Sequence, residues 1–507
     1  MSEEVLVIGA GIAGLCTALA LGPTGRRVTV LERDGLPPSG DANEAFDNWS
    51  RRGAGHLRHS HAFLARLAKI IKSDHPELHD DLLALGVREV NFDAMLSPSQ
   101  KASYQPAAAD ADFTLLFSRR TTLELAIRRY VQRMANVTIK SDAMVRSLIT
   151  EKDASGAIRV RGVVTDEGEM RADVVIDASG KNGSGIEQLI GEGACVAEEP
   201  ESAGILYFTR HYRLKPGKSE PAREGNPPSS GDLGYLKFGV FPADNGCFSI
   251  TLAVPEIEYE MRKAIMHPEI WDGVMANLPG TKVWTDGEIA EPTGKILGMG
   301  DLQSRWREMV ADGKPVALGY FAVGDTLIRT NPLYGRGCSM AAVQAYILRD
   351  VLVSASDSTA RALAYHQRLQ AELKPYYTAM RKQDRAAIRR AEQTLTPSYK
   401  PGLRAKLMRS FAEDAVGPAM RFDINLLREA MRGFHMLEHP DAWLKRPANM
   451  IRILSYWARG KKANAAAYQP KPGPEREMMM RALGLSAEAD IELLAQRRRD
   501  EALAKAA

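Results

Sequence analysis

The first 33 residues show a strand, a glycine-rich turn, a helix and a second strand in succession. A short apolar run at residues 5–8 is followed by GAGIAG, by the apolar stretch LCTALALG, and by RRVTVLE, in which β-branched residues alternate with others. Continuous and alternating apolar patterns of this length are typical of strands, and the stretch between them is typical of a helix. The sequence therefore predicts an N-terminal βαβ unit.

Further elements of the same kind follow as far as residue 180. TTLELAIRRYVQRMA predicts a helix, and short strands are expected at residues 137–142, 144–149, 158–166 and 173–177. Residues 40–62 are polar, contain glycine and have no apolar period. We expect them to form a long loop, and loops of that length inside a compact domain usually have a function.

The pattern changes near residue 200. Residues 204–214 and 236–254 are long β-rich runs, and Ala243-Asp244-Asn245-Gly246 divides the second run as a hairpin turn would. This indicates an inserted antiparallel sheet. From Cys338 onward the sequence is mostly helical.

These patterns predict an α/β fold with four parts. A Rossmann-like domain takes residues 1–199, including the loop 40–62, and residues 301–395. Residues 200–300 form an inserted mixed β-sheet domain for the substrate. Residues 396–507 form a C-terminal helical region, whose amphipathic spacing favours packing on the domain or a second subunit. A lid over an apolar channel and attachment to a membrane surface are the alternatives.

The composition argues against several classes of protein. The 507 residues carry a formal net charge of only +4, which gives no basic field large enough for nucleic acid. The four cysteines are far apart, so we expect reduced thiols that serve as small apolar filler in a cytoplasmic protein. The N-terminus has no secretory pattern, and no apolar run is long enough to span a membrane, although peripheral membrane contact stays open.

The glycine-rich turn has the spacing of a dinucleotide-binding loop. Gly9, Gly11 and Gly14 form G-x-G-x-x-G between the predicted strand and helix, and Glu32 ends the next strand. Gly9 permits the tight turn, Gly11 lets a pyrophosphate approach the backbone, and Gly14 lets helix and strand pack closely. Glu32 is suited to a ribose diol, which disfavours NADP at this position.

A second motif favours FAD over NAD. Ala322-Val323-Gly324-Asp325, followed by NPLYGRG at residues 331–337, resembles the late flavin motif of FAD-dependent monooxygenases of the p-hydroxybenzoate hydroxylase type. The resemblance covers about residues 1–395. It implies that Asp325 binds the ribityl chain and that the turn and the following helix start lie near the flavin. The residues that it assigns to the cofactor in this turn are Gly324, Asp325, Pro332, Gly335 and Gly337.

The resemblance adds three further cofactor residues. Arg120, at the start of a predicted helix, is similar to the family arginine that reaches the FAD phosphates or ribityl hydroxyls, although the adjacent Arg119 leaves this assignment open. Gly180 ends VVIDASG, which resembles the strand that returns to the FAD domain. Arg33, directly after Glu32, is the third candidate.

The electron source is open at this point. Family members that reduce their flavin with a nicotinamide carry an Asp-Gly motif with a downstream Ser and Arg, whereas the equivalent stretch here is DASGKNGSGIEQLI. This departure resembles the epoxidase, halogenase and geranylgeranyl-reductase branches. We therefore expect either NAD(P)H or reduced flavin from a separate flavin reductase.

Two segments resemble the epoxidase branch and supply the candidates for catalysis. The loop RRGAGHLRHSHAFL contains His61, and the strand YFTRHY contains Arg210, which is a candidate for orienting the substrate or the oxygen species. The spacing of His56, His59 and His61 matches no zinc pattern, so no metal is expected, and loop pinning is an alternative role for His61. Tyr207, Phe238, Phe241 and Phe248 are candidate walls of the substrate pocket, with core packing as the alternative.

The resulting hypothesis is a flavin-dependent monooxygenase. It would insert one atom of O2 into a lipophilic substrate, by epoxidation or hydroxylation, through a flavin hydroperoxide. The alternatives are an FAD-dependent reductase that saturates an isoprenoid-like alkene, a flavin-dependent halogenase, and a protein that binds FAD without catalysis. Halogenation is disfavoured because the family's W-x-W-x-I-P motif is absent from the sequence.

Overall fold

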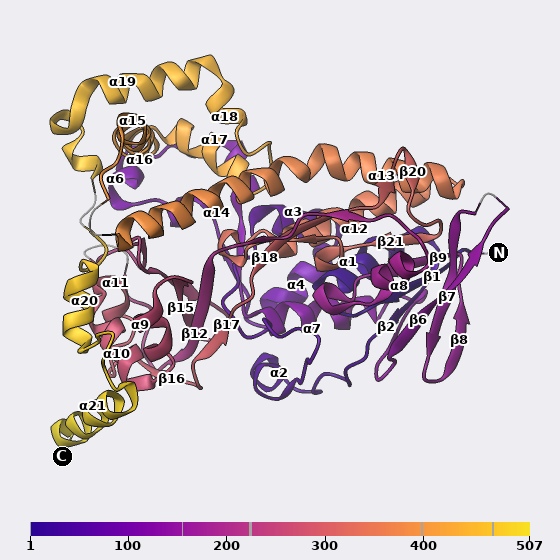
Figure 1. Ribbon diagram of the computed structural model, residues 1–507, viewed down its shortest axis with the longest axis horizontal. Coiled ribbons are helices and arrows are strands. Elements are labelled where there is room, and N and C mark those ends of the chain that lie inside the picture. Colours follow the sequence, from indigo (N-terminus) through magenta and orange to yellow (C-terminus); the bar gives the residue numbers. More distant parts are fainter. Residues whose placement is uncertain (1, 155, 223–225, 397–398, 469–470, 507) are drawn as a thin grey trace. The chain divides into compact units, whose positions relative to one another are not determined.

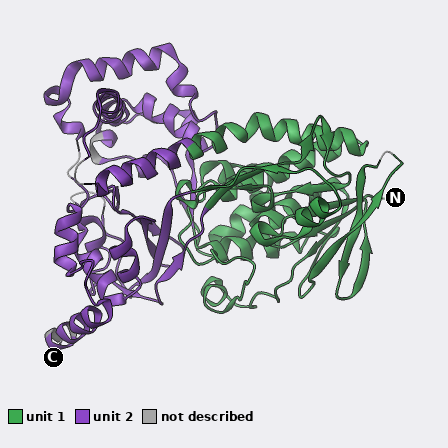
Figure 2. Ribbon diagram, viewed as in Figure 1, with its two compact units in different colours: residues 1–88, 118–202, 303–381 green, residues 89–117, 203–302, 382–507 purple. Residues whose placement is uncertain are grey.

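The computed structural model describes residues 2–506 apart from 155, 223–225, 397–398 and 469–470. The chain divides into two compact units, which Figure 2 shows in separate colours. Unit 1 contains residues 1–88, 118–202 and 303–381, and unit 2 contains residues 89–117, 203–302 and 382–507. Each unit therefore combines segments that are far apart in the sequence.

Unit 1 is built on a parallel sheet of five strands in the order β21-β9-β1-β2-β5. All of its pairings are parallel. The predicted βαβ unit is confirmed, because β1 pairs with β2 from Glu4 with Arg27 to Ile8 with Leu31. The strands are β1 (Glu4–Ile8), β2 (Arg27–Leu31), β5 (Val137–Lys140), β9 (Val174–Asp177) and β21 (Tyr320–Ala322).

Three helices pack together beside this sheet (Figure 1). They are α1 (Ile12–Leu21), α7 (Arg120–Val131) and α12 (Gly337–Ser354). Every residue of α1 is buried, as expected for a helix that is apolar on all sides. The unit also contains α3 (Ala65–Asp74), α4 (Pro76–Ala84), α8 (Gly185–Gly191), α13 (Ser358–Glu372) and the start of α14 (Lys374–Leu395).

Smaller sheets complete unit 1. Antiparallel strands β6 (Val145–Lys152), β7 (Ile158–Thr165) and β8 (Gly168–Arg171) form one of them. A second joins β10 (Ala197–Glu198), β11 (Glu201–Ser202), β18 (Gln303–Glu308) and β22 (Ile328–Arg329). A two-stranded sheet is formed by β19 (Val310–Ala311) and β20 (Lys314–Pro315).

The predicted loop 40–62 is not entirely irregular, because it contains the helix α2 (Ala42–Asn48). The Asp41 carboxylate accepts hydrogen bonds from the backbone N–H groups of Asn43 and Glu44, at 2.8 and 2.9 Å. This cap satisfies donors that a short helix otherwise leaves open. The polar composition of the segment did not indicate this helix, which begins at its capping residue Asp41.

Unit 2 contains the inserted sheet, in the order β13-β14-β15-β12-β16, with β17 also paired to β12. Its described strands are all antiparallel, so the sheet itself is not mixed. The predicted hairpin is confirmed, and both Asn245 and Gly246 have positive φ, which suits a tight turn. The strands are β12 (Ile205–Leu214), β13 (Ser230–Asp232), β14 (Lys237–Pro242), β15 (Cys247–Pro255), β16 (Ala290–Pro292) and β17 (Leu297–Met299).

One face of the inserted sheet supports a large apolar core. Phe208, Tyr212, Phe238 and Phe248 belong to it, together with Trp271 of α10. Side chains alternate between the two faces of a strand, so Tyr207, Thr209 and His211 belong to the opposite face. The helices that contribute core residues are α9 (Tyr259–Ala264), α10 (Pro268–Asn277) and α20 (Arg476–Leu483).

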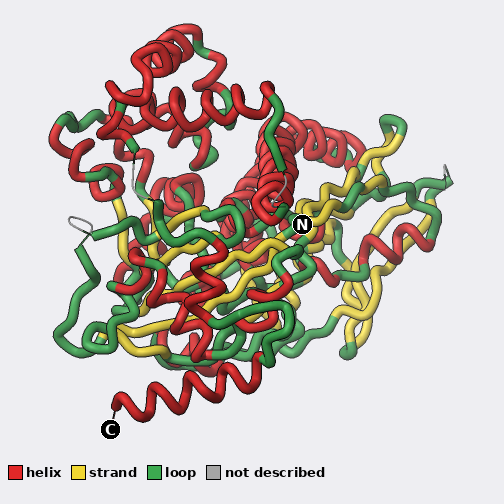
Figure 3. The backbone as a smooth tube through the Cα atoms, turned by 60° about the vertical axis from the view of Figure 1, so that its left-hand side comes forward, coloured by secondary structure: helices red, strands yellow, loops and turns green. Residues whose placement is uncertain are grey.

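The rest of unit 2 is mainly helical, and the view in Figure 3 shows the C-terminal end of the chain as a helix, α21 (Ile491–Ala506). A separate small core joins residues between Ala415 and Ile453, including Leu426 and Trp443. Its elements are the π-helical segment η6 (Phe411–Val416), α16 (Gly417–Phe422), α17 (Ile424–Phe434), α18 (Ala442–Lys445) and α19 (Pro447–Ala463). The helix α15 (Leu403–Ser410) precedes η6 and contributes no residue to this core.

All four cysteines are free. Cys16, Cys247 and Cys338 are buried, as expected for apolar filler, whereas Cys195 is exposed and departs from that expectation. Among the residues that the structure describes, no helix is both long and apolar enough to cross a membrane.

Candidate functional site

The glycine loop of unit 1 is tightly constrained on one side and open on the other. Gly9 has φ +96°, and its N–H donates to the carbonyl oxygen of Leu31 at 2.7 Å. A Cβ on Gly14 would lie 1.8 Å from the Gly9 carbonyl oxygen, so only glycine fits there. A Cβ on Gly11 would meet nothing nearer than the Arg51 guanidinium, at 3.9 Å. The open side of Gly11 is where a pyrophosphate can approach the backbone.

The start of α1 leaves its backbone donors available to an anion. Gly11 is the N-cap and supplies no side-chain hydrogen bond, and the first turn contains no acidic residue. Free N–H groups and the helix dipole together favour negative charge at such a terminus. This part of the site fits the diphosphate of a dinucleotide.

Glu32 is held at the end of β2 and also holds the glycine loop. Its carboxylate accepts hydrogen bonds from the N–H groups of Ala10 at 2.8 Å and Asp34 at 3.0 Å. Glu32 therefore fixes the loop backbone in addition to its predicted contact with a ribose. Arg33, the adjacent candidate, lies beside the loop after α2, because a Cβ on Gly53 would be 3.1 Å from its Nη2.

Arg51 was not predicted as a site residue. Its guanidinium is buried, donates to the Ala10 carbonyl oxygen at 3.1 Å, and forms ion pairs with Glu32 at 3.2 Å and Glu124 at 3.0 Å. Asp34 lies 3.8 Å from its Nε, which makes no hydrogen bond among the described residues. An arginine in this place brings a fixed positive charge to the glycine loop, which suits a diphosphate.

The structure distinguishes Arg120 from Arg119. The Arg119 guanidinium lies over the ring of Phe46 and donates to the side chain of Asn43, so it faces α2. Arg120 is buried and donates through Nε to Glu124 at 2.7 Å. Glu124 thus joins Arg51 to Arg120, and its own side chain is fully buried. Its spacing of four residues from Arg120 on a helix is the one signal by which the sequence could have shown it.

The predicted flavin turn follows β21. Gly324 has φ +68°, and its N–H donates to the Gln344 side chain at 3.0 Å. The Asp325 carboxylate makes no hydrogen bond within the described part of the chain. Burial raises the pKa of Asp325, while the positive charges of Arg120, Arg329 and Arg305 oppose that shift. A carboxylate that has no hydrogen bond to the described residues and lies among positive charges can accept hydrogen bonds from hydroxyl groups, such as those of a ribityl chain.

The turn continues through Pro332 and Gly335 to the start of α12. Gly335 has φ +64°, and a Cβ there would lie 3.4 Å from Ala62, so the turn meets the segment that contains His61. Gly337 begins α12 and is exposed, and no neighbour lies within 4 Å of where its Cβ would be. No side chain caps this helix and no acid lies in its first turn. A second anion-favouring helix terminus is therefore present in unit 1.

Gly180 is fixed to the same turn. Its N–H donates to the Thr326 hydroxyl at 3.0 Å, and the Thr326 hydroxyl lies 3.3 Å from the Gly180 carbonyl oxygen. Asp177, which ends β9, accepts from the Tyr320 hydroxyl at 2.7 Å and from Ser179. The Asp177 carboxylate thus holds Gly180 and the flavin turn together. We call the glycine loop 9–14, Glu32, Gly180 and the turn 324–337 the cradle.

His61 is held between the side chain of Arg120 and the backbone of its own loop. Its Nε2 lies 3.3 Å from Arg120 Nη1, which can only donate, and its Nδ1 lies 2.8 Å from the His59 carbonyl oxygen, which can only accept. These two partners suit a ring that carries its proton on Nδ1. Burial and the nearby charge of Arg120 also hold the pKa of His56 well below its usual value. No group of residues suited to a metal occurs among those that the structure describes.

The candidates in unit 2 lie on two different faces of the sheet. Phe238 and Phe248 are core residues, and Phe248 stacks on Tyr212 with ring centroids 5.2 Å apart. Arg210 belongs to this core face, where it donates to Asp272 of α10 at 2.9 Å. Two of the predicted candidates, Tyr207 and Phe241, belong to the opposite face. There the Thr209 and Thr251 hydroxyls share a hydrogen bond of 2.7 Å.

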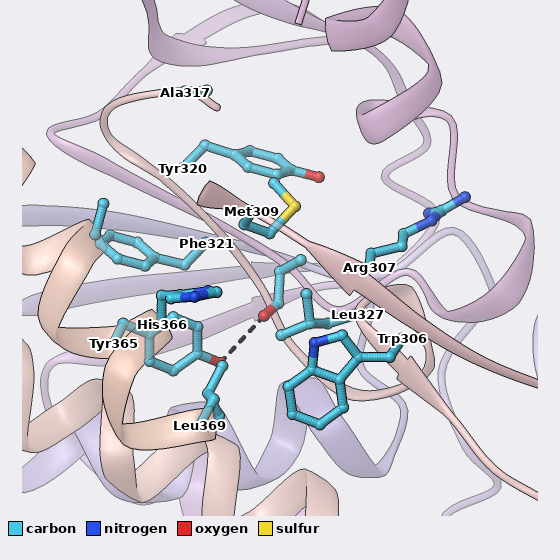
Figure 4. Close-up of a pocket in the computed structure, with 12 residues that line it drawn as sticks. Trp306, Arg307, Met309, Ala317, Tyr320, Phe321, Leu327, Tyr365, His366 and Leu369 are labelled. Atoms are coloured by element: carbon cyan, nitrogen blue, oxygen red, sulfur yellow. Dashed lines mark hydrogen bonds between the residues drawn. The ribbon is translucent and has the colours of Figure 1, made fainter. Parts of the chain in front are cut away.

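A small pocket in unit 1 contains none of the predicted cofactor residues. It lies among β18, β21 and α13, and its lining includes Trp306, Tyr320, Phe321 and His366 (Figure 4). The Tyr365 hydroxyl donates to the Ala322 carbonyl oxygen there, at 3.1 Å. Its free volume of about 20 Å³ is room for about one water molecule, so it accommodates neither FAD nor a substrate.

Comparison with known proteins agrees with the flavin interpretation. Residues 4–237 match the family model described as FAD dependent oxidoreductase. A Mycobacterium tuberculosis protein named Rv3254 is 29% identical over 381 residues, which cover 69% of this chain and 73% of that protein.

Solved structures share the fold at low sequence identity. The flavin-dependent brominase Bmp2 aligns with a TM-score of 0.58 and 18% identity over 90% of this chain and 100% of its own. PqsL from Pseudomonas aeruginosa, a probable FAD-dependent monooxygenase, aligns with a TM-score of 0.55 and 17% identity over 77% and 97%. Residues 4–237 thus match an FAD-dependent oxidoreductase domain, and the chain shares the fold of a flavin-dependent brominase and of a probable FAD-dependent monooxygenase.

Proposed function

We propose that the protein is a flavin-dependent monooxygenase that inserts one oxygen atom from O2 into a lipophilic substrate, by epoxidation or hydroxylation. The observation that carries the proposal is the arrangement at the end of β21. Asp325, Arg120 and the uncapped start of α12 belong to one unit with the glycine loop, and the resemblance places the flavin there. Bound FAD supplies the redox chemistry and the activation of oxygen.

The residues of unit 1 serve the cofactor mainly by position and charge. Gly9, Gly11, Gly14 and Arg51 would hold the diphosphate, and Asp325 would hold a ribityl hydroxyl. The first N–H groups of α12 would stabilise negative charge on a reduced ring. His61 keeps Arg120 in place as a neutral acceptor, so we assign it a positioning role and not that of a proton donor.

The substrate would contact the face of the inserted sheet opposite its core. This face contains Tyr207, Thr209 and Thr251 near its middle, which combine an aromatic surface with neutral hydroxyl groups. Arg210 is on the core face and paired with Asp272. The proposed substrate contacts are therefore on this second face and do not include Arg210, Phe238 and Phe248. A face with aromatic and hydroxyl groups suits a neutral lipophilic molecule.

We infer that electrons come from a separate flavin reductase in the cytoplasm. The stretch after β9 lacks the family's nicotinamide motif, and Asp177 is engaged in holding the cradle. The cysteines are free, which fits a reducing compartment. Direct reduction by NADH or NADPH is the alternative, and anaerobic bleaching of the flavin by either nucleotide would establish it.

A product assay under three conditions tests the reaction class. The FAD-loaded enzyme is reduced by light and mixed with a panel of terpenoid alkenes and phenols, first without oxygen, then with oxygen, and then with oxygen and bromide. Oxygenated products that require O2 support the proposal. Saturated products without oxygen would identify an alkene reductase, and brominated products would identify a halogenase, which is relevant because a brominase shares the fold. A flavin that reoxidises with no product under any condition would favour a binding protein.

A further inference from the structure

The helix α15 is little covered by the residues that the structure describes. None of its eight residues, Leu403–Ser410, is buried, and the side chains of Leu403, Leu407 and Met408 are 85%, 56% and 58% exposed. α15 continues without a break into the helical elements that follow, as far as residue 422, and helices in proteins are stabilised mostly by packing an apolar face. α15 therefore has the composition of a helix that is covered by something.

A second helix of the same region also exposes apolar side chains. Ile451 and Leu454 of α19 are 68% and 43% exposed and lie three residues apart, on one side of the helix. Between residues 403 and 454, about a tenth of the chain, lie seven of the nineteen exposed large apolar side chains in the described part of the protein. Such a concentration of apolar surface marks an interaction site.

The two helices meet at the π-helical segment η6. α15 runs directly into η6, and Trp457 of α19 donates to the Ser410 hydroxyl at 3.1 Å. The rings of Phe411 and Trp457 are in edge contact, 5.6 Å apart. Figure 1 labels both helices among the C-terminal elements of unit 2. The exposed apolar residues thus belong to one locally packed structure.

The charge on these helices indicates what covers them. α15 and α19 together contain seven basic residues and no acidic residue. Arg452 pairs with Asp423 and Lys461 with Asp414, at 3.5 and 3.4 Å. The remaining five form no ion pair with any described residue. They are Arg404, Lys406, Arg409, Arg459 and Lys462.

We propose that α15 and α19 attach the enzyme to the surface of an anionic lipid bilayer. Exposed leucine, isoleucine and methionine side chains among unpaired lysines and arginines are the features of helices that lie in the headgroup region. A bilayer would cover the apolar side chains and neutralise the basic ones together. This proposal extends the proposed function, since a lipophilic substrate would dissolve in the same bilayer, but it does not depend on the reaction catalysed.

Vesicle sedimentation with the full-length, FAD-loaded protein tests the proposal. The protein should sediment with vesicles of phosphatidylcholine that contain phosphatidylserine, sediment less with pure phosphatidylcholine, and be released in part by added salt. The double variant Arg404→Gln with Lys406→Gln should bind anionic vesicles roughly 25-fold more weakly, about fivefold for each charge. Leu403→Ser with Leu407→Ser should weaken binding at least about tenfold.

Matched controls come from exposed residues of unit 1. Leu36→Ser with Val353→Ser removes apolar side chains of 69% and 64% exposure, and Lys152→Gln with Lys314→Gln removes two exposed charges. Both controls should bind like the unaltered protein, and FAD absorbance should be the same in all variants. The proposal is overturned if the unaltered protein does not sediment with anionic vesicles, or if the α15 variants bind as well as the controls. A shift from dimer to monomer in the leucine variant, measured by light scattering, would instead identify a second copy of the chain as the occupant.

Discussion

The two units of the chain use charge in different ways. Around its glycine loop, unit 1 buries three arginines, Arg51, Arg120 and Arg128, with three acids, Glu32, Asp34 and Glu124. The inserted sheet of unit 2 has an aromatic and aliphatic core, and the partner of its buried Arg210, Asp272, is 61% exposed.

The proposed function would account for this difference by what each unit binds. Burying ions costs solvation energy that their pairing only partly returns, so a buried network of this size is weak evidence for stability. FAD has a diphosphate and hydroxyl groups at fixed positions, so a site for it would require residues that are held in place. A neutral substrate requires shape and a few hydroxyl groups, so unit 2 carries little that identifies its ligand.

Substitution of two glycines in the cradle should give the largest effects and separate folding from cofactor binding. Gly14→Ala should prevent folding of unit 1, because its Cβ would overlap the Gly9 carbonyl oxygen. Gly11→Ala meets no protein atom closely, so it should fold and yet bind FAD about tenfold or more weakly, a loss of about 1.4 kcal/mol. Far-ultraviolet circular dichroism and FAD titration distinguish the two results.

Gly55→Ala is the control for both glycine variants, because Gly55 has no neighbour within 4 Å of its Cβ position and no positive φ. Equal loss of structure in Gly11→Ala and Gly14→Ala would show that the open side of Gly11 is not a ligand site.

Among the substitutions that still allow folding, removal of the charge on Glu124 should lower the free energy of unfolding most. Glu124→Gln leaves Arg120 and one side of Arg51 without their carboxylate, and breaking a buried ion pair costs about 3–5 kcal/mol. Urea unfolding measures the loss. Asp166→Asn, which breaks the exposed pair with Arg146, should change the midpoint little. Equal effects of the two substitutions would contradict the buried network.

Unit 1 should lose stability in mild acid through His59. Burial lowers the pKa of His59 to about 4, from an ordinary value of 6.5. The unfolded chain therefore binds more protons than the folded chain below pH 6.5. This contribution to stability is complete above pH 6.5 and falls by on the order of 3 kcal/mol as the pH decreases to 4. Unfolding of His59→Gln between pH 7.5 and 4.5 should show a smaller pH dependence than that of the unaltered protein, and parallel curves would refute the assignment.

Loss of the Asp325 charge should weaken the cofactor without unfolding the protein. Asp325→Asn should lower FAD affinity roughly ten- to hundredfold, which corresponds to a hydrogen bond to a charged group, about 1.5–3 kcal/mol. Asp312→Asn, at an exposed turn in the same unit, is the matched control. An unchanged FAD affinity would remove Asp325 from the cofactor site.

The smallest effect is expected in unit 2. Thr209→Val removes the hydrogen bond to Thr251 and should cost about 1 kcal/mol of stability. FAD affinity should be unchanged, while the KM for a turned-over alkene or phenol should change. If the variant loses FAD and keeps its KM, the proposed division of work between the units is wrong.

Local patterns made the cradle largely predictable. The strand, the glycine turn and Glu32 lie within the first 32 residues and depend on neighbours in the sequence, and the resemblance located Asp325. The cluster around Glu124 was not predicted, because Arg51 and Glu124 are 73 residues apart and only tertiary packing joins them. Arg51 lies in a polar segment that has no apolar period, so no local pattern distinguishes it.

Two other differences have identifiable signals in the sequence. Asp41 with Glu44 three residues later is the start signal of α2. Strict alternation along YFTRHY separates Tyr207 from Arg210, so the two could not both have faced the same ligand across a flat strand. The sequence does not show which face of this strand packs against the core, because aromatic residues occur on both faces.

The most direct test of the account is the fate of oxygen. The FAD-loaded enzyme, reduced by light and mixed with oxygen-18 gas and the same panel of alkenes and phenols, should give products that contain one labelled oxygen atom. The parallel reaction in oxygen-18 water with ordinary oxygen should leave them unlabelled. Products that take their oxygen from water, or products formed equally well without O2, would contradict a monooxygenase.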